Sequence, residues 1–236
     1  MANYFSPTVV VRIVAALVLL TSFTSCFSPQ PVDAAFKANR KQRVAVVTME
    51  APKASVHHLG GQGILDMALN QAFASKTRKR LEDYPSQAKL DEVGRQMVAK
   101  LRSNGYQADL MADHPKLKDF APIIAKPSDK KPIPGRGTYL QSYDAVIYIA
   151  MPIVGQVQMV YGFIPLSDRN AAAVINGSMF ETRTQKRIWR SPLGNPATNN
   201  VDVTGDGSNI DNVFQAIDRA LQASSTTVMG HFFTGF

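Results

Sequence analysis

The sequence predicts a single domain of the α/β (α+β) class, with a mixed β-sheet of about five strands packed by about three helices. Three observations predict this class: β-branched runs typical of buried strands, three segments in which apolar residues recur at helical spacing, and consecutive strands that form an antiparallel meander. Of the 236 residues, 45% are hydrophobic and 19% are charged. This composition suits one hydrophobic core and argues against wholesale disorder.

The first elements are a strand, a loop and a helix. Residues 43–49 (RVAVVTM) are expected to form a strand that is buried on both faces. Residues 51–63 follow as a loop. From residue 62 to about residue 80, apolar side chains recur at helical spacing, so we expect an amphipathic helix whose stripe packs on the core. The stripe consists of Leu65, Leu69, Ala72 and Phe73.

A second helix is expected over residues 86–103, between a break at Pro85 and the stop signal Asn104-Gly105. Its apolar stripe consists of Leu90, Val93, Met97 and Leu101. Residues 106–111 are compatible with a strand. Residues 112–138 are rich in proline, glycine and lysine, and we expect a long irregular surface loop there.

The meander begins with residues 143–150, another strand of the buried type, and continues with the alternating run at 154–163. After a turn at 165–170, residues 171–182 form the next expected strand. A polar turn then leads into a short strand at 187–190.

The last helix shows its apolar stripe over residues 210–221, with Ser208 or Asn209 as the N-cap. The tail at 228–236 holds three phenylalanines. We expect this tail to fold back over the core. An exposed tail would instead be a partner-binding segment.

The first 25 residues are expected to be a signal peptide, because Arg12 precedes the apolar run 13–20 and small or hydroxyl residues follow it. The run is too short for a transmembrane helix. Cys26, the only cysteine, follows Phe23-Thr24-Ser25 and so resembles the lipobox of bacterial lipoproteins. The resemblance implies that Cys26 becomes the lipidated first residue of the mature chain, anchored in a membrane through acyl groups such as palmitate.

On this interpretation, residues 26–42 are a lipid-anchored flexible tether and residues 43–236 are the globular domain. Two alternatives stay open. Ordinary signal peptidase could cleave after Ala34, which would discard Cys26 and release a soluble secreted or periplasmic protein. The apolar N-terminus could also occur by chance in a cytoplasmic protein.

The order of these elements resembles small bacterial envelope lipoproteins whose fold is similar to the N-terminal domain of the Tol-system protein TolB. The resemblance covers roughly residues 43–225. It rests on the strand YDAVIY at 143–148, the glycine-rich approach to the first helix, and the hairpin SMFETRTQKRIW at 178–189. Members often have Asp and Gly where this chain has Glu181 and Gln185. The family includes penicillin-binding-protein activators, curli-secretion proteins and transport auxiliaries, which implies accessory work without shared catalytic residues.

The chemistry-bearing residues exclude several classes. One cysteine excludes an intramolecular disulfide, a cysteine-rich zinc module and a CxxC redox pair. No GxSxG, SxxK or HExxH signature is present, so we expect no enzyme activity and no cofactor. His57 and His58 are adjacent and point apart on regular structure. The segment 202–207 lacks the later glutamate of a calcium loop, so we expect no metal site.

Two groups of residues are candidate sites. Gly60, Gly61 and Gly63 could present backbone N–H groups to a phosphate or carboxylate, although a tight turn before the helix is the favoured explanation. The second group is a set of cations that form either an interaction surface for anionic lipid, cell-wall polymer or acidic protein, or a solvated face. These cations are Lys76, Arg78, Lys79, Arg80, Lys130, Lys131 and Arg136.

The expected function is that of a non-catalytic accessory or structural interaction protein of the bacterial envelope, in an assembly, cell-wall or transport complex. The net charge of +8 favours anionic partners. We expect a lipid anchor on the periplasmic face of a membrane, with the outer membrane favoured, an envelope protein complex as partner, no nucleic acid, and oligomers as an option. The alternative is a soluble periplasmic small-ligand or anion-binding protein that uses the loop at 56–63.

Overall fold

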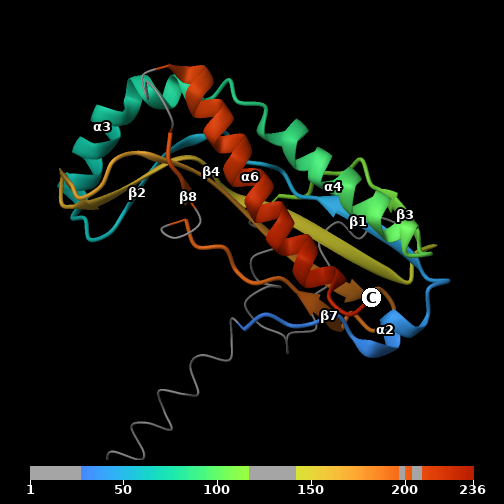
Figure 1. Cartoon of the computed structure of the whole chain (residues 1–236). Helices are drawn as coiled ribbons and strands as arrows, with labels where there is room; N and C mark the ends of the chain where they lie inside the picture. The colour runs from blue at the N-terminus through green and yellow to red at the C-terminus, as the bar shows by residue number, and fades with distance from the viewer. Residues whose placement is uncertain (1–27, 117–141, 197–199, 204–208) are drawn as a thin grey trace, which may run out of the picture.

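The computed structural model describes residues 28–116, 142–196, 200–203 and 209–236. This part of the chain is an open mixed sheet of eight strands with four helices (Figure 1). The helices are α2 (Ala34–Ala38), α3 (Ile64–Leu81), α4 (Ser86–Ser103) and α6 (Ile210–Phe233). The strands are β1 (Arg43–Thr48), β2 (Ser55–Leu59), β3 (Gln107–Leu110), β4 (Ala145–Tyr161), β5 (Ile164–Pro165), β6 (Asn170–Glu181), β7 (Arg187–Arg190) and β8 (Asn200–Val201). The predicted class and the single domain are confirmed, with more strands than expected.

The main path of the sheet runs β3-β1-β4-β6-β7. β1 lies parallel to both β3 and β4, whereas β6 is antiparallel to β4 and to β7. The two strands expected at 143–150 and 154–163 are one strand, β4, which continues through an irregularity between Ala150 and Ile153. Gln185, in the turn before β7, has a φ of 62°, in the left-handed region that glycine favours.

One face of the sheet is covered by α4 and α6, which run side by side across it (Figure 1). The predicted stripe of α4 is buried there, including Leu90, which is fully buried. Asp218 on α6 ties the two helices together, because it accepts a hydrogen bond from Tyr84 at 2.7 Å and pairs with Lys89 at 2.8 Å. The other face of β1 and β4 forms a second buried cluster, so the expectation of a first strand buried on both faces is confirmed.

α6 begins at the predicted N-cap Asn209, whose side chain accepts the Asp211 N–H at 2.9 Å. The helix is longer than expected and includes most of the phenylalanine tail. Phe232 is fully buried against Trp189, and Phe236 packs at the edge of the core. The expectation that the tail covers the core is therefore confirmed, with a helix in place of a returning loop.

The expected flexible tether at 26–42 is wrong over residues 28–42, which are packed on the domain. Gln30 exchanges both backbone hydrogen bonds with Arg190, at 2.9 and 3.0 Å. Val32 is buried, and Phe36 of α2 stacks on Tyr106 with ring centroids 5.0 Å apart. Two apolar side chains and an edge pairing are enough to hold a segment that has no apolar period.

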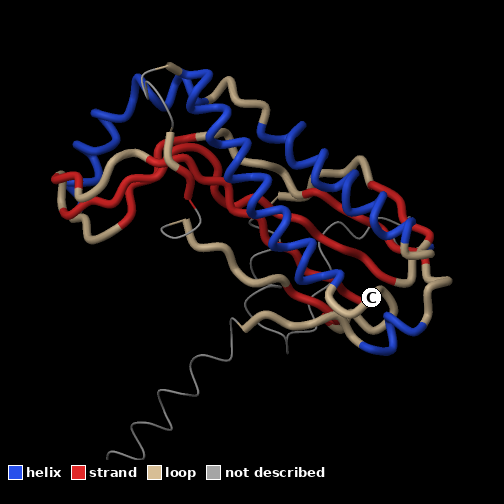
Figure 2. The backbone as a smooth tube through the Cα atoms, viewed as in Figure 1, coloured by secondary structure: helices blue, strands red, loops and turns tan. Residues whose placement is uncertain are grey.

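β2, β5 and the far halves of β4 and β6 extend beyond α4 and, together with α3, form a lobe at the end away from the C-terminus (Figure 2). We call this the distal lobe. β2 lies within the predicted loop at 51–63, so that part of the expectation is wrong. Among the described residues, no helix is both long and apolar enough to cross a bilayer.

Candidate interaction surface

The distal lobe depends on a close approach between β2 and β4. Gly155 of β4 has a φ of 130°, and a Cβ atom there would lie 2.0 Å from the Ser55 carbonyl oxygen. Gly60, just after β2, has a φ of 118°, and its Cβ would lie 2.3 Å from the Val160 carbonyl oxygen. Only glycine fits these two positions, so the pairing of β2 with the far half of β4 requires both glycines.

α3 packs on this lobe with the opposite side from the one expected. Its buried residues are Asn70, Ala74 and Leu81, while its apolar stripe faces solvent. Asn70 holds the helix, because its Nδ2 donates to Gln62 Oε1 at 2.9 Å and to the Gly162 carbonyl at 3.0 Å. The expectation that this stripe packs on the core is therefore wrong. Periodicity locates a stripe on a helix, but it does not say whether the stripe covers the core or a partner.

Helix α3 and the β4–β5 hairpin together carry ten of the eleven exposed large hydrophobic residues in the described chain. We call these ten residues the distal apolar patch. The most exposed are Ile64 (86%), Leu65 (72%), Phe73 (71%) and Tyr161 (70%). The others are Met67, Leu69, Met159, Phe163, Ile164 and Leu166. Apolar residues gathered at one end of a domain mark an interaction site.

The two halves of the patch meet at the start of α3. A Cβ atom on Gly162, in the hairpin, would lie 3.5 Å from the Asp66 carboxylate. The sequence did not identify the hairpin residues as exposed. Alternation places the apolar residues of a strand on one face, but it does not show whether the rest of the domain covers that face. The apolar run at 163–166 after Gly162, at a turn where polar residues are usual, was the available signal.

The predicted cations Lys76, Arg78, Lys79 and Arg80 all lie on the C-terminal half of α3. No ion pair involves them within the described residues. At this end of the helix they also complement the helix dipole. The remaining predicted cations, Lys130, Lys131 and Arg136, lie outside the described residues, as does Cys26.

The glycine loop fits the tight-turn explanation. The Gly63 N–H at the start of α3 already donates to the Asp66 carboxylate at 2.9 Å. The Gly61 carbonyl accepts the Gly162 N–H at 2.8 Å, which joins the loop to the hairpin. An anion at Gly63 would have to displace a carboxylate of the same helix. Anion binding by Gly60, Gly61 and Gly63 stays a prediction.

A cavity of about 710 Å³ lies between α3, the far parts of β4 and β6, and the start of α6. Lys76, Arg80 and Arg169 supply cations to its wall, and Asp168 and Asp202 supply carboxylates. Gln156 of β4 also lines the cavity, is only 3% exposed, and has an Oε1 atom without a hydrogen-bond partner among the described residues. Sequence reasoning missed Gln156 and Arg169, since neither belongs to a recognisable motif.

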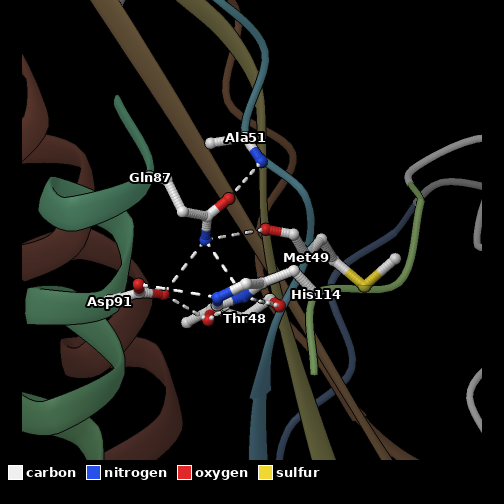
Figure 3. A network of polar contacts seen from close by, with 6 residues as sticks. All are labelled: Thr48, Met49, Ala51, Gln87, Asp91 and His114. Atoms are coloured by element: carbon white, nitrogen blue, oxygen red, sulfur yellow. Dashed lines mark hydrogen bonds and ion pairs between the residues drawn. The ribbon is translucent and has the colours of Figure 1, made fainter. Parts of the chain in front are cut away.

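A polar cluster stands at the C-terminal end of β1, where α/β folds often place their sites (Figure 3). The Thr48 hydroxyl donates directly to Asp91 at 2.6 Å, and His114 Nδ1 lies 3.3 Å from the same hydroxyl. Gln87 closes the cluster by donating to Asp91 at 3.0 Å and accepting the Ala51 N–H at 2.8 Å.

This cluster is not arranged as a nucleophile, base and orienting acid, because the threonine bonds the acid itself and not through the histidine. Thr48 is also fully buried. The cluster therefore ties β1 to α4 and to the segment that carries His114.

The two adjacent histidines of β2 lie in the distal lobe. His57 Nε2 is 3.1 Å from the Val154 carbonyl oxygen. Burial lowers the pKa of His57, the hydrogen bond to Val154 opposes this, and the charge of Arg78 lowers the pKa further. Within the described residues, no three His, Cys, Asp or Glu side chains are grouped to hold a metal ion.

No protein-family profile matches the sequence, and no curated protein matches it. Among solved structures, a hypothetical protein from Chlamydia trachomatis is similar over 83% of this chain and 99% of its own length, at 12% identity and a TM-score of 0.33. A Helicobacter pylori homologue of neuraminyllactose-binding hemagglutinin is similar over 86% of this chain and 87% of its own, at 10% identity and a TM-score of 0.32. A Neisseria meningitidis lipoprotein is similar over 62% and 78%, respectively, at 15% identity and a TM-score of 0.24. Likenesses of this strength carry no argument about function.

Proposed function

We propose that this chain is a non-catalytic interaction protein of the bacterial envelope, anchored through a lipid on Cys26, that docks through its distal apolar patch. The observation that carries the proposal is the outward stripe of α3. A helix whose apolar side faces water while Asn70 faces the sheet is explained if a partner covers that side. The adjoining hairpin enlarges the same surface.

The packing of the N-terminal segment supports processing at Cys26 over cleavage after Ala34. Cleavage after Ala34 would remove Val32, which is 5% exposed, and Asp33, whose side chain accepts the Ala35 N–H at 2.8 Å. It would also remove Gln30 and its pairing with β7. A mature chain that begins at Cys26 keeps all of these contacts. The same proposal places the lipid anchor in the outer membrane and the chain in an envelope protein complex.

The test uses the full-length tagged protein in its native host, with in-cell cross-linking and mass spectrometry of the isolated membranes. We expect the wild-type protein to incorporate palmitate and to cross-link to envelope neighbours through the distal apolar patch. Cys26→Ala should lose the label, and the triple variant Leu65→Ser, Phe73→Ser, Phe163→Ser should lose the cross-linked neighbours. Leu193→Ser, at the one exposed large apolar residue outside the patch in the described chain, is the matched control. Unchanged neighbours in the triple variant would overturn the proposal.

A second candidate function, binding of a small anionic ligand, is favoured by the cavity. Its size suits a small molecule, and its wall carries three cations against two carboxylates. Gln156 Oε1, which has no partner among the described residues, would accept a hydrogen bond from a ligand N–H or O–H group. Calorimetric titration with glutarate and with glutamate probes the two features separately, since glutarate has carboxylates only and glutamate adds an ammonium donor. We expect Gln156→Leu to weaken glutamate binding more than glutarate binding. Absence of heat with both probes counts against this function.

A further inference from the structure

We propose that the surface on which the distal apolar patch docks is a bilayer rich in anionic lipid. This inference rests on the proposed function and names the partner of the same surface. It follows from the order of residues along the exposed side of α3, from the make-up of the hairpin, and from the scarcity of acidic residues on α3.

The exposed stripe of α3 changes character along its length. Leu65, Leu69, Phe73, Lys76 and Arg80 follow one another at spacings of four, four, three and four, and so share one side of the helix. The first three are apolar and the last two are basic, and all five are exposed to solvent. A membrane surface that receives the three apolar side chains therefore also meets the two cations.

The hairpin adds aromatic and aliphatic side chains at the end of the lobe. Tyr161, Phe163 and Ile164 are 70%, 58% and 53% exposed. Tyrosine is favoured at membrane interfaces, because its ring is apolar and its hydroxyl stays in contact with the headgroups. The hairpin therefore supplies side chains that enter the acyl boundary while the cations of α3 meet lipid phosphates.

A second copy of the chain is a poorer partner for this surface. The only acidic residue of α3 is Asp66, and its carboxylate already accepts the Gly63 N–H. Two stripes placed face to face would bring Lys76 and Arg80 toward a surface without a free carboxylate on that helix. A bilayer rich in anionic lipid offers its acyl boundary to the apolar part of the stripe and its phosphates to the two cations.

The experiment uses tryptophan reporters in the full chain carrying Cys26→Ala, so that no acyl group holds the protein at the vesicle. The natural Trp189 is fully buried at the opposite end of the sheet and serves as an internal reference. Phe163→Trp places a reporter in the patch, and Leu193→Trp is the matched control at an exposed site elsewhere. The probes are vesicles of brominated phosphatidylglycerol with phosphatidylethanolamine, and vesicles of brominated phosphatidylcholine. Every variant has the same N-terminal apolar run, so the comparison isolates the patch.

We expect the phosphatidylglycerol vesicles to quench the Phe163→Trp reporter and to leave the Leu193→Trp reporter bright. Tyr161→Trp is a second reporter at the same hairpin, should Phe163→Trp fail to fold. Removing two cations with Lys76→Gln and Arg80→Gln should weaken vesicle affinity about fivefold for each, or about 25-fold together. The Phe163→Trp chain with both cations intact should bind phosphatidylcholine vesicles with an affinity reduced to a similar extent.

The inference is overturned if both hairpin reporters stay as bright as the control, or if affinity is the same for both kinds of vesicle. If the reporters stay bright while the in-cell experiment still finds a protein neighbour that depends on the patch, an acidic protein is the partner and the proposed function stands. If both experiments fail, the proposed function fails with the inference.

Discussion

The orientation of α3 supports both proposals, and its energetic consequence can be tested directly. Leu65 and Leu90 are both leucines on apolar helical stripes, in neighbouring helices of equal length. Leu90 is fully buried, so Leu90→Ala removes packed methyl groups and leaves a cavity, which costs about 2–5 kcal/mol. Leu65 is 72% exposed, so folding removes only about a quarter of its surface from water. Full burial of a leucine side chain contributes about 1.5–3 kcal/mol, and a quarter of that is less than about 0.8 kcal/mol. The Leu65→Ala substitution should therefore cost less than about 0.8 kcal/mol of stability.

The assay is urea unfolding of the purified chain, followed by the fluorescence of Trp189. This residue is the only tryptophan and is fully buried, so its emission reports on the core. We expect the midpoint to fall strongly for Leu90→Ala and little for Leu65→Ala, at an unchanged slope. Equal losses in the two variants would mean that the stripe of α3 is covered by the rest of the domain in solution, and the patch would not exist as described.

Two further predictions concern the same lobe. Gly60→Ala should destabilise the fold by about 1–3 kcal/mol or more, because its φ of 118° and the 2.3 Å approach to the Val160 oxygen exclude a Cβ atom. Gly61→Ala is the control, because its Cβ would lie 4.0 Å from the nearest atom, and it should change stability by less than about 0.5 kcal/mol. Equal melting temperatures for the Gly60→Ala and Gly61→Ala variants would refute the argument. The free energy of unfolding should fall as pH drops below 6.5, because burial and then Arg78 lower the pKa of His57 and the unfolded chain binds a proton that the folded chain does not. Urea unfolding between about pH 5 and about pH 7.5 should give a flatter dependence for His57→Gln, and an unchanged slope contradicts the assignment.

The elements that sequence patterns predict correctly are those whose periodicity arises from burial within the domain. α4 shows its stripe because the sheet covers that stripe, and β1 is uniformly apolar because both of its faces are covered. The N-cap Asn209 was also one of the two candidates, since side-chain capping is a local property. Such features depend on a few neighbouring residues and can be read from the chain itself.

The features that were missed depend on contacts between distant segments. β2 has no strand signature and forms because Gly155, almost a hundred residues later, lets it approach β4. The stripe of α3 recurs at helical spacing as that of α4 does, but the bonds of Asn70 to Gln62 and Gly162 and the packing of Ala74 and Leu81 bury the opposite side. The cations of α3 were found from charge alone, whereas the apolar half of the surface was assigned to the core.

If the proposed lipid anchor and the proposed docking surface act together, the length of β4 sets how the domain would lie at a membrane. The Arg190 side chain donates a hydrogen bond to the Ser28 carbonyl oxygen. In the sheet, Arg190 of β7 pairs with Ser178 of β6, which pairs in turn with Tyr148 of β4. From Tyr148 to Tyr161 the strand spans at most about 43 Å at about 3.3 Å per residue. Because residues 28–42 are packed on the domain, this stretch of strand would act as a spacer between the proposed lipid anchor and the distal apolar patch. A lipid on Cys26 and a patch in the same bilayer require the domain to lie along the membrane, with its two contacts held apart by the strand.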